Sequence, residues 1–117
     1  MVDVYATDEM LAWYRELTVS EANAVDRSVR LLAEMGVALE HPHSSSIKSS
    51  RYPLRELRAT AGHSELRVIY AFDPRRDAAL IIGGNKSGNA RFYDQIVPVA
   101  EKIWEEYLAE QKAGKHG

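Results

Sequence analysis

The chain has 117 residues, of which 45% are hydrophobic and 27% are charged, as expected for one globular domain. It contains no cysteine, which excludes disulfides, thiolate metal sites and cysteine nucleophiles. The net charge is −2, but residues 43–91 hold nine Lys/Arg against four Asp/Glu while both flanking segments are acidic. This division predicts a cationic surface for a polyanion such as RNA, although the same asymmetry also occurs in proteins that bind no nucleic acid.

The amino-terminal part is predicted to form a short strand and two helices. Residues 2–6 alternate in polarity as an edge strand does, and a helix is expected over residues 7–17. Thr18 and Glu21 form a T-x-x-E capping box, which begins a longer helix that stops at Gly36. We expect the two helices to form an antiparallel hairpin, because almost no linker separates them.

The middle of the chain is predicted to be a loop followed by three strands. Residues 37–53 are rich in proline and serine, and we read them as a long loop. Strand patterns then cover residues 54–59, 66–73 and 78–85, and the short turns between them predict an antiparallel meander. In the middle strand one face is apolar, whereas the face that carries Arg67 is mixed and is expected to stay partly open.

A final helix is predicted from about Asn89, with Pro98 expected to kink or restart it and residues 111–117 read as a frayed tail. The fold class is therefore α+β, in one domain over residues 1–117. We expect the N-terminal helical hairpin to pack on a twisted antiparallel β-sheet, with the helices on one face of it. No apolar run reaches the ~18 residues of a membrane span and residues 1–10 do not resemble a signal peptide, so a cytoplasmic location without membrane contact is expected.

Four short motifs stand in the cationic segment and just after it. They are L-R-E-L-R at residues 54–58, R-V-I-Y-A-F-D-P-R-R at 67–76, I-I-G-G-N-K-S-G at 81–88 and R-F-Y at 91–93. With the element order, they resemble the RelE/ParE toxin superfamily over roughly residues 2–110, and within it most closely the HigB-like (phage Gp49-like) branch. The resemblance implies a RelE-like fold and the toxin half of a type II toxin–antitoxin system.

The resemblance also implies an activity and partners. Most characterised members cleave mRNA in the ribosomal A site, so we expect a ribosome-dependent mRNA endoribonuclease whose partner is a HigA-type helix-turn-helix antitoxin. Two alternatives stay open: a ParE-like inhibitor of DNA gyrase, and an inactive prophage-derived module that only binds its antitoxin. The net negative charge departs from the strongly basic character of many ribosome-acting members and weighs against tight binding of ribosomal RNA.

RNA cleavage without a metal needs three kinds of group. One group takes the proton of the attacking 2′-hydroxyl, cations stabilise the phosphorane, and a donor protonates the leaving 5′ oxygen. No His, Asp and Glu residues stand at metal-ligand spacing, and neither a metal nor another cofactor is expected.

The resemblance suggests Arg58, Arg67, Lys86 and Tyr93 as the catalytic residues. For Arg67 it implies phosphate contact, whereas the competing interpretation from the residues is an ion pair with Glu56 or Glu65. Lys86 follows a Gly-Gly-Asn sequence whose small residues permit close approach of a phosphate. Its ammonium is a candidate to hold the scissile phosphate or to act as base or acid, and the alternative is a solvated turn lysine. Tyr93 is expected to support the 2′ oxygen or to stack on a base.

Further residues are candidates for weaker roles. Lys48, Arg51, Arg55 and Arg91 are expected to extend the cationic track that binds the RNA backbone. His63 stands in a predicted turn, and it is a possible proton donor if that turn folds over the cleft.

Overall fold

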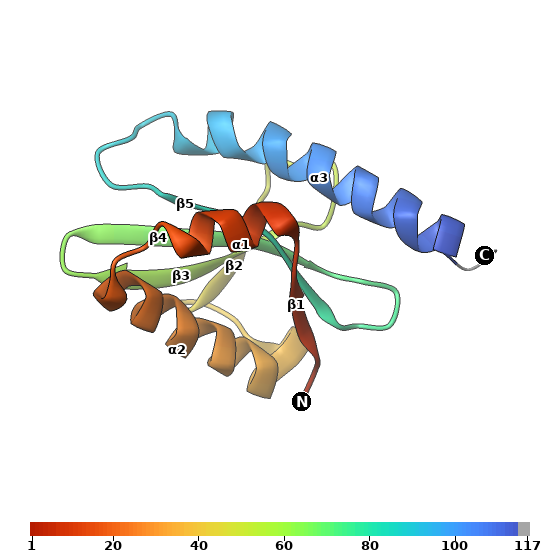
Figure 1. Ribbon diagram of the computed structural model, residues 1–117, viewed down its shortest axis with the longest axis horizontal. Helices are drawn as coiled ribbons and strands as arrows, with labels where there is room; N and C mark the ends of the chain where they lie inside the picture. The colour runs from red at the N-terminus through yellow and green to blue at the C-terminus, as the bar shows by residue number, and fades with distance from the viewer. Residues whose placement is uncertain (115–117) are drawn as a thin grey trace.

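One five-stranded sheet and three helices make up the fold, shown in Figure 1. It is described by a computed structural model, which covers residues 1–114 and leaves residues 115–117 undescribed. In chain order the elements are β1 (Val4–Ala6), α1 (Asp8–Arg15), α2 (Val19–Met35), the short 3-10 helix η1 (Gly36–Ala38), β2 (Ser44–Ser46), β3 (Arg55–Ala61), β4 (Ser64–Phe72), β5 (Ala78–Asn85) and α3 (Phe92–Gly114).

The strand order across the sheet is β1-β5-β4-β3-β2. The predicted meander of β3, β4 and β5 is confirmed, and β2 adds a further antiparallel strand beside β3. β1 instead runs parallel to β5, so the sheet is mixed rather than wholly antiparallel. β2 lies where a loop was predicted, because three successive serines carry no strand pattern and only pairing with β3 makes them a strand.

The starts of the first two helices follow from their sequence. The Thr7 hydroxyl accepts a hydrogen bond from Met10 N–H, and the capping box of Thr18 and Glu21 is formed in both directions. Such side-chain bonds satisfy backbone N–H groups that have no partner inside the helix. Both helices therefore begin directly after their capping threonines.

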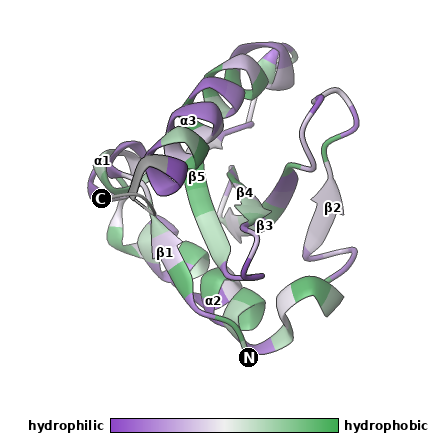
Figure 2. Cartoon of the chain, turned by 90° about the vertical axis from the view of Figure 1, so that its right-hand side faces the viewer, coloured by the Kyte–Doolittle hydropathy of each residue, from purple (hydrophilic) through white to green (hydrophobic). Residues whose placement is uncertain are grey.

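Two separate cores lie on the two faces of the sheet. On one face, α1 and α2 cover apolar side chains of β3 and β4 such as Leu57, Val68 and Tyr70. On the other face, α3 covers a second cluster that includes Ile69 and Ile81. Figure 2 places α2 and α3 on opposite sides of the strands. The expectation that all helices lie on one face is wrong, and the face that carries Arg67 is buried rather than open, because it too has an apolar stripe for a helix to cover.

Two consecutive glycines in β5 let helices from opposite faces approach the sheet. A Cβ added at Gly83 would lie 2.3 Å from the ring of Trp13 in α1, and one added at Gly84 would lie 2.8 Å from Phe92 in α3. Aromatic rings therefore fill the space beside these glycines, which was expected to admit a phosphate. These glycines serve helix packing in this fold.

The carboxyl-terminal helix is longer than expected. α3 runs through Pro98 without a restart and continues to Gly114, so residues 111–114 are helical where a frayed tail was expected. Residues 115–117 of that tail lie outside the described part of the chain. No helix among the described residues combines the length and the apolar character that crossing a membrane requires.

Candidate functional site

The fold brings the four residues proposed as catalytic to one region at the end of the sheet. Arg58 of β3 and Arg67 of β4 are direct partners in the strand register, and Arg67 is also paired with Gly84 of β5. Lys86 follows the end of β5 by one residue, and Tyr93 is the second residue of α3. Four segments that are separate in the sequence therefore supply these side chains to the α3 face.

A buried carboxylate, that of Glu56 in β3, connects these groups. Glu56 Oε1 accepts a hydrogen bond of 2.7 Å from Tyr93 Oη and lies 3.1 Å from Arg67 Nε. Its other oxygen, Oε2, accepts a bond of 3.2 Å from Ser45 Oγ, and Ser45 Oγ also accepts one of 3.2 Å from Arg58 Nη2. We call the group formed by Ser45, Glu56, Arg58, Arg67, Lys86 and Tyr93 the Glu56 cluster.

The ion pair between Glu56 and Arg67 is buried. Glu56 is 5% exposed and Arg67 is 7% exposed. An ion pair that is withdrawn from water to this extent is costly to break, because the remaining charge has no solvent to stabilise it. The ion-pair interpretation of Arg67 is therefore the one found in the structure, with Glu56 as the partner.

The two arginines of the cluster keep part of their hydrogen-bonding capacity. Arg67 Nη1 donates to the Leu66 carbonyl at 2.9 Å, but its Nε approaches Glu56 without hydrogen-bond geometry. Arg58 Nε is likewise buried and makes no hydrogen bond within the described part of the chain. Two arginines that are partners in the strand register, with the one carboxylate of Glu56 beside Arg67, leave local positive charge that suits a phosphate.

Tyr93 is a hydrogen-bond donor in this arrangement. Its partial burial raises the pKa of the Tyr93 hydroxyl, the hydrogen bond to Glu56 raises it further, and Arg67 opposes this change. Near neutral pH the hydroxyl therefore keeps its proton and points it at the Glu56 carboxylate. Tyr93 cannot act as a preformed phenolate base.

Lys86 lies over the face of the Tyr93 ring. Its ammonium nitrogen is 5.3 Å from the ring centroid, a cation–π distance, and its backbone N–H donates to the Glu65 carbonyl at 2.8 Å. The turn between β3 and β4 abuts the same loop, because Ser87 Oγ donates to the His63 carbonyl at 2.7 Å. The residue His63 itself is exposed at the tip of that turn.

The residues predicted to bind the RNA backbone are not gathered together. Lys48 and Arg91 are exposed and free to meet a ligand. Arg51 pairs with Glu105 of α3, twelve residues after Tyr93 and so about 18 Å further along the helix axis. Arg55 lies on the opposite face of the sheet from the Glu56 cluster, where it donates to Tyr70 Oη, to the Leu39 carbonyl and to serine hydroxyls of β2.

Two features of the cluster were not predicted. Glu56 was named as a possible ion-pair partner of Arg67, and its hydrogen bond with Tyr93 was not foreseen, since that contact depends on how α3 crosses the sheet. Ser45 was placed in a loop and carried no signal at all. The alternation of β3 did correctly put Glu56 and Arg58 on one face.

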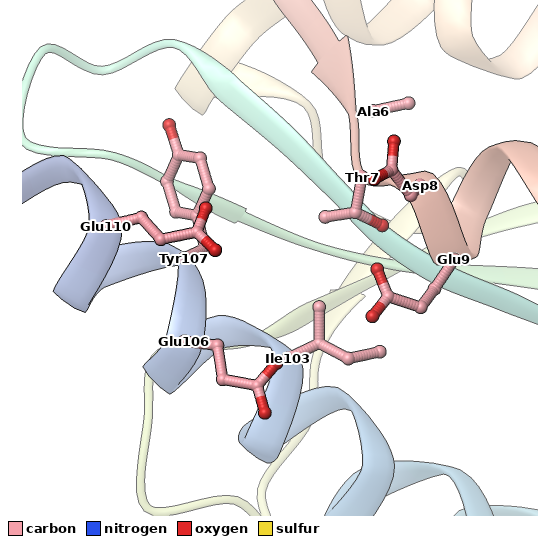
Figure 3. Close-up of a pocket in the computed structure, with 8 residues that line it drawn as sticks. All are labelled: Ala6, Thr7, Asp8, Glu9, Ile103, Glu106, Tyr107 and Glu110. Carbon is pink, nitrogen blue, oxygen red and sulfur yellow. The ribbon is translucent and has the colours of Figure 1, made fainter.

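Among the residues that the structure describes, hollows border α3 at both of its ends. One of about 230 Å³ borders the cluster and is lined by Tyr93, Asp94, Val97 and Pro98 with Ser49 and Glu101. The other, of about 300 Å³, lies between the start of α1 and the second half of α3, and Figure 3 shows the side chains of Asp8, Glu9, Glu106 and Glu110 around it. Four carboxylates disfavour an RNA phosphate there. No group of three His, Asp or Glu residues in the described part of the chain is arranged to hold a metal ion.

The α+β domain, with its helical hairpin, strand meander and final helix, has the architecture of the RelE-like class of proteins. Comparison with known families is more specific. Residues 12–105 match the family described as phage derived protein Gp49-like (DUF891), and the chain belongs to this family. The family resemblance drawn from the sequence motifs is thereby confirmed.

Two relatives come from Mycobacterium tuberculosis. The protein named "Putative toxin HigB3" is 36% identical over 104 residues, which are 87% of this chain and 90% of that protein. The protein named "Putative toxin HigB2" is 33% identical over 106 residues, which are 88% of this chain and 53% of that protein. The chain thus spans about half the length of the second relative. No solved structure gives a significant match to the chain.

Proposed function

We propose that this protein is the toxin of a type II toxin–antitoxin pair and acts as a ribosome-dependent mRNA endoribonuclease. The observation that carries the proposal is the Glu56 cluster, in which two arginines, a lysine and a tyrosine meet on one face of the sheet. Membership in the Gp49-like family and similarity to two proteins named as HigB toxins support the toxin role.

The cluster has the groups that metal-independent cleavage requires. Arg58 and Arg67 supply the positive charge that stabilises a phosphorane, and Lys86 supplies an ammonium at the border of the site. Tyr93 lies between Lys86 and Glu56, at the hollow beside α3. In this proposal the scissile phosphate lies against Lys86 and Arg58, with the attacking ribose next to Tyr93, and the buried Arg67 contributes its charge without direct contact.

The partner that follows from this proposal is an antitoxin of the HigA type, encoded beside the toxin. Its binding would silence the enzyme either by covering the cluster or by holding the protein away from the ribosome. Co-expression with the product of the adjacent gene is expected to restore growth.

Primer extension on mRNA after induced expression tests the activity. Wild-type protein is expected to arrest growth and to leave transcripts cut at ribosome-bound positions. Lys86→Ala is expected to abolish the cuts while the protein stays folded. Lys102→Ala makes the same chemical change on an exposed face of α3 and serves as the matched control. Growth arrest with intact mRNA and trapped gyrase–DNA complexes would replace this proposal with gyrase inhibition, and harmless expression would reject toxicity altogether.

A further inference from the structure

Glu56 has no part in the cleavage roles described so far, yet it is the only carboxylate that Tyr93 meets among the described residues. One of its oxygens receives the Tyr93 hydroxyl proton at 2.7 Å and the other receives the Ser45 hydroxyl at 3.2 Å. The side chain is 5% exposed and faces Arg67 at 3.1 Å. Burial of a carboxylate is costly, and an apolar residue would pack equally well under α3.

We propose that Tyr93 and Glu56 form a proton relay, in which Glu56 takes the proton that Tyr93 passes on from the 2′-hydroxyl of the RNA. This inference rests on the proposed ribonuclease function. Glu56 is buried behind Tyr93, so it meets the substrate only through the phenol. Tyr93 in turn can accept a proton from the ribose only when it gives its own away, because it keeps its proton near neutral pH.

Every atom in the relay has a stated destination. As the bond between the 2′ oxygen and phosphorus forms, the 2′ proton moves to Tyr93 Oη and the phenolic proton moves to Glu56 Oε1. The bond from phosphorus to the 5′ oxygen breaks, and that oxygen takes a proton from the Lys86 ammonium. The products are a 2′,3′-cyclic phosphate and a 5′-hydroxyl. Proton exchange with water then restores Glu56 and Lys86.

The surroundings of the pair suit this direction of transfer. Arg67 lies beside the acceptor oxygen and holds the carboxylate in place, while Ser45 fixes its second oxygen. Lys86 contacts the ring of Tyr93, with its ammonium nitrogen 5.3 Å from the ring centroid, whereas Glu56 contacts the hydroxyl. The proton acceptor and the proton donor of the reaction therefore contact different parts of the same tyrosine.

The decisive variant is Glu56→Gln, assayed in single-turnover cleavage of mRNA on programmed ribosomes. Glutamine keeps an oxygen that accepts the Tyr93 hydrogen bond, but it cannot take up the proton. We expect the cleavage rate at saturating protein to fall by about 100-fold or more. The half-saturating concentration is expected to change by less than about threefold, because binding does not use Glu56. Glu65→Gln, the same change at an exposed residue of β4, is the matched control and keeps the wild-type rate.

A second variant guards against a folding defect in the first. Tyr93→Phe removes the other member of the relay. The double variant Tyr93→Phe/Glu56→Gln is expected to cleave no more slowly than the slower of the two single variants, because each substitution blocks the same proton pathway. Carbon-13 NMR of the tyrosine rings supplies a readout without ribosomes. In Glu56→Gln the Tyr93 resonance is expected to titrate at lower pH than in wild type, because the carboxylate no longer holds the proton.

The outcomes separate the relay from the proposed function. Wild-type protein that cuts no mRNA would reject the nuclease and the relay together. Active wild type with Glu56→Gln at nearly the same rate would reject the relay alone. A raised half-saturating concentration with an unchanged maximal rate would also overturn it and leave Glu56 as a support for binding. An unchanged Tyr93 titration would remove the hydrogen bond on which the relay depends.

Discussion

Two tyrosine–carboxylate hydrogen bonds in this protein have almost the same length and very different surroundings. Tyr93 donates to Glu56 at 2.7 Å under the first turn of α3, and Tyr5 donates to Asp73 at 2.6 Å near the other end of that helix. Asp73 also accepts the backbone N–H groups of Arg75 and Asp77 in the turn between β4 and β5. The Tyr5 bond therefore closes a turn and ties β1 to it.

The neighbours of each pair decide what it can do. Around Tyr93 and Glu56 the fold gathers Arg67 and Lys86, so the pair stands in positive surroundings. The Tyr5 ring packs at a tilt against the ring of Tyr107, whose hydroxyl donates to Tyr5 and which borders the acidic hollow. On charge alone, a phosphate is expected to favour the surroundings of the first pair over those of the second. The same bond is thus part of a candidate active site in one place and part of the framework in the other.

The largest expected difference between the two pairs is in RNA cleavage. Tyr93→Phe is expected to lower the rate of mRNA cleavage on ribosomes by about 100-fold or more, because the proton pathway is lost. Tyr5→Phe deletes the same hydroxyl from the other pair and is expected to stay within about twofold of wild type. Equal losses in the two variants would show that the hydroxyls act only through stability.

A large effect on stability is expected from the ion pair that only the first pair has. Arg67→Met leaves the Glu56 carboxylate buried without its cation and is expected to cost about 3–5 kcal/mol of unfolding free energy. The double variant Glu56→Met/Arg67→Met removes both charges and is expected to recover most of that loss. Urea denaturation measures both. A double variant as unstable as the single one would mean that packing, and not charge, holds this region.

A smaller difference is expected between the two tyrosines in how much their hydroxyls stabilise the fold. Each of Tyr5→Phe and Tyr93→Phe removes a hydrogen bond to a carboxylate and is expected to cost about 1.5–3 kcal/mol. Tyr5→Phe is expected to be the more damaging, because the Tyr107 hydroxyl also loses its acceptor. Thermal denaturation of the two variants provides the comparison, and the reverse order would contradict it.

The smallest effect is a dependence of stability on acid. Burial alone would raise the pKa of Asp73, but hydrogen bonds from Tyr5, Asp77 and Arg75 lower it below its ordinary value of 3.8. A carboxyl whose pKa is lower in the folded state stabilises the fold above its unfolded pKa, and this contribution is lost as the pH falls through the folded pKa.

Asp73→Asn is therefore expected to weaken the decline of stability below the ordinary pKa of 3.8, measured as the urea midpoint between neutral pH and pH 3. Asp3→Asn, at an exposed residue of the same edge, is the control and is expected to leave that decline unchanged. An Asp73→Asn curve parallel to wild type would show that the turn contributes nothing to acid sensitivity.

Much of the local structure could be read from the residues. The threonine caps predicted where α1 and α2 begin, because a cap depends only on side chains and backbone within one turn. The meander followed from strand patterns and short turns. Arg58, Arg67, Lys86 and Tyr93 were singled out from motifs, and the fold does bring them to one region.

The predictions that were wrong concern features that depend on contacts between distant segments. β2 is a strand because it pairs with β3, and β1 runs parallel to β5, a strand from which α1, α2, β2, β3 and β4 separate it along the chain. The mixed face of β4 was expected to stay partly open, whereas α3 covers it. The alternating residue pattern of β4 does not indicate which helix covers which of its faces.

The sequence by itself determined the α+β class, the helix starts and the charge of the middle segment. These properties depend on residue type and on spacing along the chain. Only the tertiary structure decided that Gly83 and Gly84 serve helix packing, that Arg55 faces away from the cluster and that Glu56 lies between Arg67 and Tyr93. The physical reason is that burial and hydrogen-bond partners are set by the packing of α3 across the sheet, which joins residues far apart in sequence.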